Sequence, residues 1–207
     1  MPEAQGIKAD NRAMLQLKPG AMGTYITGND LLRPLQPHRG IMFPYQPDIT
    51  FSQSVNYSPY DMTHTNYTFN AYRNTPSPSI QMNAQFANVT IEEGRYTLAC
   101  IHFLRSVTKM FFGIKDLGNV PKAGTPPPVL TFSAFGPQSF NRVPVVVESF
   151  STNYDSQSDL KDIDGTNLPV VMNMFIGLSV QQNPDRQKNV YSTNGFISGN
   201  MYKEGFI

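Results

Sequence analysis

The sequence predicts a mainly β domain, built of antiparallel strands as a sandwich or partial barrel, with one long α-helix packed against it. Several segments alternate apolar and polar residues, and turn-forming Pro, Gly, Asn and Ser separate these segments. Residues 91–112 instead place apolar side chains every three or four positions, which is the helical period. A chain of 207 residues can enclose one substantial core.

Residues 1–47 are expected to form an extended, proline-rich N-terminal arm, because Pro34, Pro37, Pro44 and Pro47 interrupt any long element. The main β domain is expected to span residues 48–182. Its first strands are predicted from alternation at residues 49–57, 65–73 and 79–89, with a turn at "SPYD".

The helix is predicted to begin with a capping box, in which Thr90 and Glu93 bond each other's backbone amides, and to end at Gly113. One apolar stripe is expected to face the subunit's own sheet: Tyr96, Cys100, Phe103, Leu104, Val107 and Phe111. A second ridge is expected to meet a neighbour or the N-terminal arm: Leu98, Ile101 and Phe112. Truncation of Phe103 to Ala should therefore cost about 3–5 kcal/mol. Ile101→Asp should leave the fold largely intact and weaken association.

A proline-rich loop is expected after the helix, followed by strands at residues 129–136, 142–154 and 168–182. The polar segment 155–167 is expected as a hairpin loop. The strands on either side of it exceed the usual strand length, so they are predicted to form a long antiparallel hairpin that pairs edge to edge with neighbouring subunits. Residues 183–207 are expected as a C-terminal aromatic tail.

The composition favours a protein that hides part of its surface in an assembly. Sixteen basic and fifteen acidic residues nearly cancel, so neither a nucleic-acid clamp nor a polybasic membrane anchor is indicated. Charged residues make up only 15% of the chain while aromatic residues make up 12%, which suits β structure and buried interfaces. The single cysteine, Cys100, excludes an internal disulfide and is expected to be an inert buried thiol.

The sequence contains no apolar leader and no run of apolar residues long enough to span a membrane, so synthesis in the cytoplasm is expected. The glycosylation patterns at Asn56, Asn66 and Asn88 are then coincidences of an Asn- and Thr-rich composition.

No enzyme, cofactor or metal site is predicted, because the common hydrolase, phosphate-binding and dinucleotide-binding motifs do not occur. The three histidines, His38, His64 and His102, are expected to be ordinary polar residues, although a fold could still bring His64 beside a Ser and an Asp. The acidic loop around Asp155 and Asp164 could gather oxygens around calcium, but its spacing does not fit an EF-hand. A solvated loop is favoured.

The order of these elements resembles a known family. A strand ending near Phe86 is followed by the capped aromatic helix, then by "AGTPPPVLTFSAFGPQSFNRVPVVVESFSTNY", a polar hairpin loop, "LPVVMNMFIGLSV" and the aromatic ending "GNMYKEGFI". Residues 65–207 thereby resemble the tail-tube fold of contractile-tailed bacteriophages, most closely the baseplate tube-initiator proteins.

This resemblance implies a structural virion protein of the phage tail. Subunits would form a hexameric ring, each giving strands to a shared β-barrel around a channel through which the genome leaves. Other tail-tube or baseplate proteins would stack on both faces of the ring, and DNA would pass without specific binding. The alternatives are another virion structural or binding β-sandwich module, from a neck, capsid or spike, and an enzyme built on a sandwich.

A ring of this kind predicts two sets of residues. The inter-subunit interface is expected at Leu98, Ile101, Phe112, Val145, Val147, Met174 and Ile176. A channel that conducts DNA should avoid rows of Lys and Arg, because phosphate contacts make binding tight. Residues 143–181 contain Lys161 as their only basic side chain, so a neutral to acidic lumen is expected, with acidic groups at Glu148, Asp155, Asp159, Asp162 and Asp164.

Overall fold

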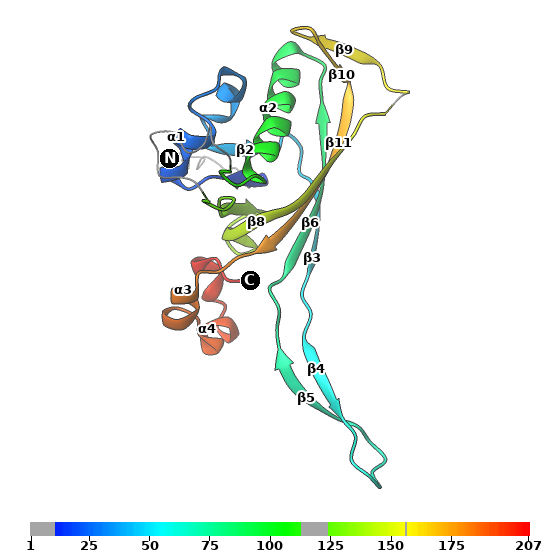
Figure 1. Cartoon of the computed structure of the whole chain (residues 1–207), viewed down its shortest axis with the longest axis vertical. Coiled ribbons are helices and arrows are strands. Elements are labelled where there is room, and N and C mark those ends of the chain that lie inside the picture. The colour runs from blue at the N-terminus through cyan, green and yellow to red at the C-terminus, as the bar shows by residue number, and fades with distance from the viewer. Residues whose placement is uncertain (1–10, 113–123, 156) are drawn as a thin grey trace, which may run out of the picture.

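The structure is a computed structural model that describes residues 11–112, 124–155 and 157–207. A seven-stranded antiparallel sheet in the order β2-β1-β7-β8-β11-β6-β3 carries helix α2 (Ile91–Val107) on one face (Figure 1). The prediction of a mainly β protein with one long packed helix is confirmed. The strands of the sheet are β1 (Met14–Gln16), β2 (Gly40–Met42), β3 (Asp48–Ser52), β6 (Ser79–Ala87), β7 (Leu130–Ala134), β8 (Phe140–Asn153) and β11 (Val171–Val180).

The core lies between α2 and the inner face of the sheet. Even-numbered residues of β6 and β11 point inward, and the register sets Met82 beside Ile176 and Ile80 beside Leu178. The sheet curls around this core, since the rings of Phe51 in β3 and Phe140 in β8 are 6.2 Å apart although two strands separate β3 from β8. The alternating pattern of the sequence therefore selects which face of the sheet is buried.

Helix α2 begins as predicted. The Thr90 side chain accepts a hydrogen bond from the Glu93 amide (3.2 Å), and the Glu93 carboxylate accepts one from the Thr90 amide (2.8 Å). Hydrogen bonds to the carboxylate, led by the one from the Thr90 backbone, hold the pKa of Glu93 below its usual value. The buried thiol predicted at Cys100 is confirmed, and burial raises its pKa.

The helix ends at Val107, five residues before the predicted end at residue 112. The Thr108 hydroxyl donates to the Leu104 carbonyl (3.0 Å), so a side chain competes for the hydrogen bonds of the last turn. Phe111 then exchanges backbone hydrogen bonds with Gly124 and Thr125 instead of continuing the helix. The predicted cap, Gly113, lies outside the described residues.

The ridge of Leu98, Ile101 and Phe112 was predicted to meet a neighbour or the N-terminal arm, and the burial of Ile101 leaves this residue no surface for a neighbour. Ile101 is 2% exposed and belongs to the same core as Phe103, while Leu98 is half-buried and Phe112, beyond the helix, is 82% exposed. Helix α2 also packs against η2 (Asp30–Leu35) of the N-terminal segment. The buried surface of α2 is therefore wider than the single apolar stripe that the sequence predicts.

The predicted extended arm is also wrong for residues 13–43. This segment contributes β1 and β2 to the sheet and forms η1 (Pro19–Ala21), α1 (Met22–Tyr25) and η2. Its prolines delimit or enter short elements without preventing them, as Pro19 does at the start of η1. The segment buries Ala13, Leu15, Leu17, Ile26, Leu32, Leu35, Ile41 and Phe43.

Three further segments differ from the prediction. The strand expected at residues 49–57 is two strands, β3 and β4 (Asn56–Tyr60), so "SPYD" continues a strand, and β4 pairs with β5 (Phe69–Asn74). The polar loop contains a hairpin, β9 (Leu160–Ile163) with β10 (Thr166–Pro169). The C-terminal tail folds into the short helices α3 (Pro184–Asn189), α4 (Thr193–Ile197) and η4 (Met201–Glu204), and the side chains of Asn183 and Ser192 cap the N-termini of α3 and α4.

Tyr96 joins α2 to the edge strand β2. Its hydroxyl donates to the Met42 carbonyl (2.7 Å) and accepts from the Met42 amide (2.8 Å), and burial raises its pKa. Tyr96→Phe leaves both backbone groups without this partner, so we expect a loss of about 1–3 kcal/mol in the free energy of unfolding, measured in urea. Tyr57→Phe, on an exposed strand, should change it by less than about 0.5 kcal/mol. Equal urea midpoints for the two variants would contradict this role of Tyr96.

Candidate assembly surfaces

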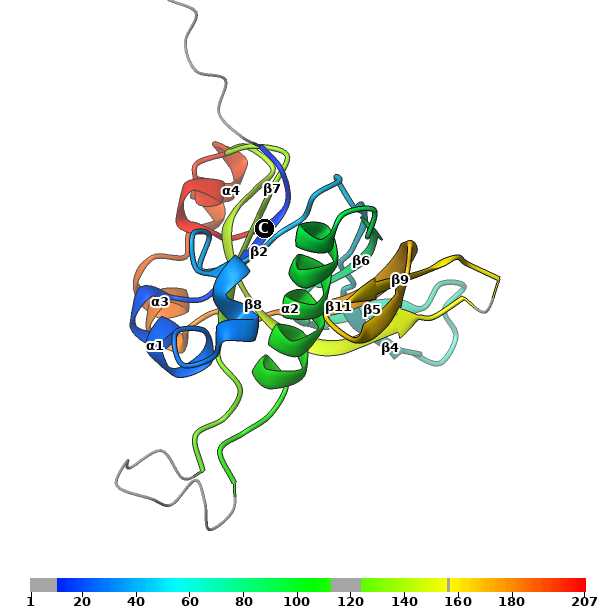
Figure 2. The ribbon, with the colours of Figure 1, turned by 90° about the horizontal axis from the view of Figure 1, so that it is seen from above.

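One face of the sheet is bare. In the part formed by β8, β11, β6 and β3, the side turned away from α2 carries no other described element (Figures 1 and 2). The strand register places its outward residues in four rows: Ser52–Ser79–Ser179–Val146, Thr50–Gln81–Gly177–Ser149, Asp48–Asn83–Phe175–Ser151, and Gln85–Asn173–Asn153. Asp48 is the single charged residue in these rows, and none is Lys or Arg.

Both edges of this four-stranded part are unpaired within the described chain. Strand β3 pairs only with β6. Strand β8 pairs with β7 through Val145 and with β11 up to Asn153, so residues 146–153 have a partner on one side only. Every step from β8 to β3 is antiparallel, and therefore the two free edges run in opposite directions. Unpaired edges of this kind are templates for pairing with another chain.

The predicted hairpin of β8 and β11 forms, but β11 cannot pair with a neighbour because it lies between β8 and β6. The predicted interface residues Val145, Met174 and Ile176 are buried in the chain's own core, as Ile101 is, so the interface prediction is wrong for these residues. The even-numbered residues of β11 were expected to contact a neighbouring subunit. In the structure, α2 and the N-terminal segment cover them instead. Half-buried Leu98 and Val147 and exposed Phe112 keep partial access to solvent.

The predicted acidic residues are exposed but do not form one row on the bare face. Glu148 is the extra residue at a bulge in β8, whereas Asp155, Asp159, Asp162 and Asp164 lie on or beside the β9–β10 hairpin. Asp164 pairs with Arg95 through two hydrogen bonds (2.7 and 3.0 Å), and the bond from Arg95 lowers the pKa of Asp164. Across the described ranges, no three His, Cys, Asp or Glu side chains cluster closely enough to hold a metal ion.

The β4–β5 ribbon is a surface that the sequence analysis did not separate from the sheet. It extends away from the body of the molecule (Figure 1), and each residue of both strands is exposed. Several large side chains are more than half exposed along it: Tyr57, Tyr60, Met62, Tyr67, Phe69 and Tyr72. An isolated two-stranded ribbon is marginally stable in water, so these side chains suit burial against another protein surface.

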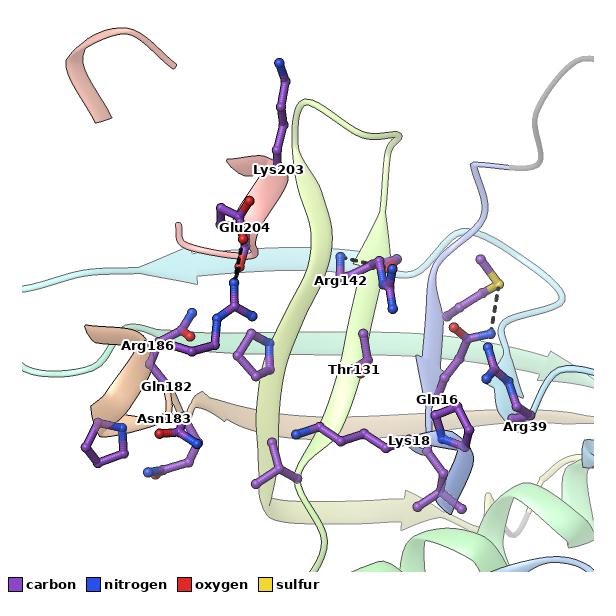
Figure 3. Close-up of a pocket in the computed structure, with 18 residues that line it drawn as sticks. Gln16, Lys18, Arg39, Thr131, Arg142, Gln182, Asn183, Arg186, Lys203 and Glu204 are labelled. Atoms are coloured by element: carbon purple, nitrogen blue, oxygen red, sulfur yellow. Dashed lines mark hydrogen bonds and ion pairs between the residues drawn. The ribbon is translucent and has the colours of Figure 1, made fainter. Parts of the chain in front are cut away.

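A basic cleft of about 960 Å³ opens between β1, β7, the start of β8 and the C-terminal helices (Figure 3). Its charged lining residues are Lys18, Arg39, Arg142, Arg186, Lys203 and Glu204. The basic residues come from widely separated parts of the chain, and therefore no local sequence motif predicts the cleft. Arg186 is paired with Glu204 (2.8 Å).

A comparison of the sequence with models of known protein families gives no match, and a comparison with curated protein sequences gives none either. Of the helices in the described ranges, none combines the length and apolar character needed to cross a membrane.

Proposed function

We propose that this chain is a structural subunit of a phage tail, in the tail tube or the baseplate tube-initiator ring, with its bare sheet face lining the DNA channel. The observation that carries the proposal is the composition of that face, in which Ser, Thr, Asn and Gln predominate and no cation stands in the four rows. Such a wall offers phosphates no Lys or Arg to bind, so DNA can pass without being held.

The two free edges support closure into a ring. When β3 of one copy meets residues 146–153 of the next, the added pair is again antiparallel, because each copy supplies four alternating strands. Contact between two different patches is heterologous, and such contacts form a ring when the rotation closes. A closed barrel leaves no edge exposed, which accounts for two edges with little charge to protect them.

We expect cysteines on the two free edges to cross-link neighbouring copies into a ladder. Thr50 is paired with Ser149, Ser151 or Asn153 in three double-cysteine variants, because the register between copies is unknown. Within one chain Thr50 and Ser149 are separated by three strand spacings, about 14 Å. A disulfide requires Cα atoms within about 7 Å, so it can only join different copies. Oxidation followed by denaturing gel electrophoresis should show a ladder that ends at the ring size.

Each single-cysteine variant is the matched control and should stop at a dimer, and buried Cys100 should contribute no bands. Electron microscopy of the cross-linked protein should show rings. Absence of a ladder in all three variants would sink the proposed edge pairing. A trimer or monomer in solution would instead favour another virion β-sandwich module.

A further inference from the structure

The basic cleft carries more positive charge than the chain itself neutralises. Glu204 is the one acidic residue of its lining, and it is engaged by Arg186, which also donates to the Glu204 carbonyl (2.8 Å). Among the described residues, Lys18, Arg39 and Arg142 form no ion pair. The cleft thus keeps at least three cations available to an anionic group from outside the chain.

Backbone structure directs part of this charge into the cleft. Arg142 lies where the β7–β8 register shifts, and its amide donates to the Ser133 hydroxyl (3.1 Å), so a local irregularity sets its orientation. Arg39 lies in the turn just before β2, and Lys18 just after β1, where the chain leaves the sheet. Figure 3 shows Lys18, Arg39 and Arg142 around the same hollow.

The complementary charge lies on the opposite side of the molecule. The β9–β10 hairpin and the loop before it expose Asp155, Asp159 and Asp162, with Lys161 as the single basic residue of residues 155–167. In both Figures 1 and 2 this hairpin lies far from the C-terminal helices, which border the cleft, so it cannot reach the cleft of its own chain. Two different patches on opposite sides suit head-to-tail contact between copies.

We propose that the basic cleft of one copy receives the acidic β9–β10 hairpin of a second copy. This inference deepens the proposed assembly function and rests on it. The occupant is assigned by charge, because a net negative hairpin meets a cleft with spare cations. The size of the cleft also suits a segment of protein better than a single ion. Contacts of this kind raise the association rate and fix which patches meet.

A charge-swap experiment tests the pairing. The cleft variant combines Lys18→Glu with Arg39→Glu, and the hairpin variant combines Asp155→Lys with Asp159→Lys, which leaves the Arg95–Asp164 pair intact. Each variant alone should self-associate at least about tenfold more weakly than the wild type at low salt, because like charges then meet. An equimolar mixture should recover association, since every cleft then finds a hairpin of opposite charge. Sedimentation velocity measures the association, and circular dichroism checks folding.

The matched control combines Lys109→Glu with Lys188→Glu, two exposed lysines outside the cleft, and should associate like the wild type. A mixture that stays dissociated, variants that associate normally, or a wild type that stays monomeric would each overturn the pairing. Binding of inorganic phosphate to the wild-type cleft, without recovery in the mixture, would show a small-anion site instead. If both variants still form rings, only the contact between cleft and hairpin is refuted. If the mixture recovers association but forms particles other than rings, the proposed ring is refuted and the contact between cleft and hairpin stands.

Discussion

If the bare face lines a DNA channel, as proposed, lysine substitutions on this face are expected to make the assembly bind the DNA that it otherwise releases. Gln81, Gln85 and Ser151 are exposed on this face, in three different rows. The triple variant Gln81→Lys, Gln85→Lys, Ser151→Lys places three cations per copy around the proposed bore. We expect DNA affinity of the assembled protein to rise at least about 100-fold at 50 mM salt and to fall steeply by 200 mM, because bound phosphates release counterions.

Fluorescence anisotropy with a labelled duplex measures this change, and sedimentation confirms that the variant still assembles. The matched control, Gln81→Glu, Gln85→Glu, Ser151→Glu, perturbs the same positions and should bind DNA no better than the wild type. If the assembled lysine variant binds DNA no more tightly than the wild type does, the bare face does not line the channel.

Local chemistry was enough to predict the centre of the fold. Alternation identified β6 and β11, because inward Ile80 and Met172 are each followed by an outward polar residue, as expected when one face of a sheet is buried. The Thr90–Glu93 capping box fixed the start of α2 for a similarly local reason. These features depend on residues that are neighbours in the sequence.

Features that depend on distant segments were not predictable. The prolines of residues 34–47 led to the prediction of an extended arm, whereas tertiary packing folds this segment into short elements that complete the core against α2. Likewise, whether an apolar ridge faces solvent, a neighbour or its own N-terminal segment cannot be read from helical period alone, and Ile101 was misplaced for this reason.

The candidate surfaces likewise combine features that the sequence predicts with features that depend on distant segments. The scarcity of basic residues between 143 and 181 is visible in the sequence, and it accounts for the absence of cations from the β8 and β11 part of the bare face. The free edges are not visible, because strand order places β11 inside the sheet and leaves β3 outside. The basic cleft combines β1, β7, β8 and the C-terminal helices, so only the folded chain brings its cations together.

Ile101→Asp is expected to prevent stable folding of the subunit, in contrast to the tolerance that helical periodicity suggests. Ile101 is 2% exposed within the main core, so Asp loses the apolar contacts and places a carboxyl group in an apolar environment. We expect a loss of more than about 4 kcal/mol, a large share of the 5–15 kcal/mol typical of a domain.

Phe103→Ala should cost about 3–5 kcal/mol by leaving a cavity. Phe112→Asp, at a side chain 82% exposed, is the matched control and should change the free energy of unfolding by less than about 0.5 kcal/mol. Denaturant titration followed by circular dichroism compares the three variants. Equal stability of Ile101→Asp and Phe112→Asp would show that this side of α2 is not part of the core.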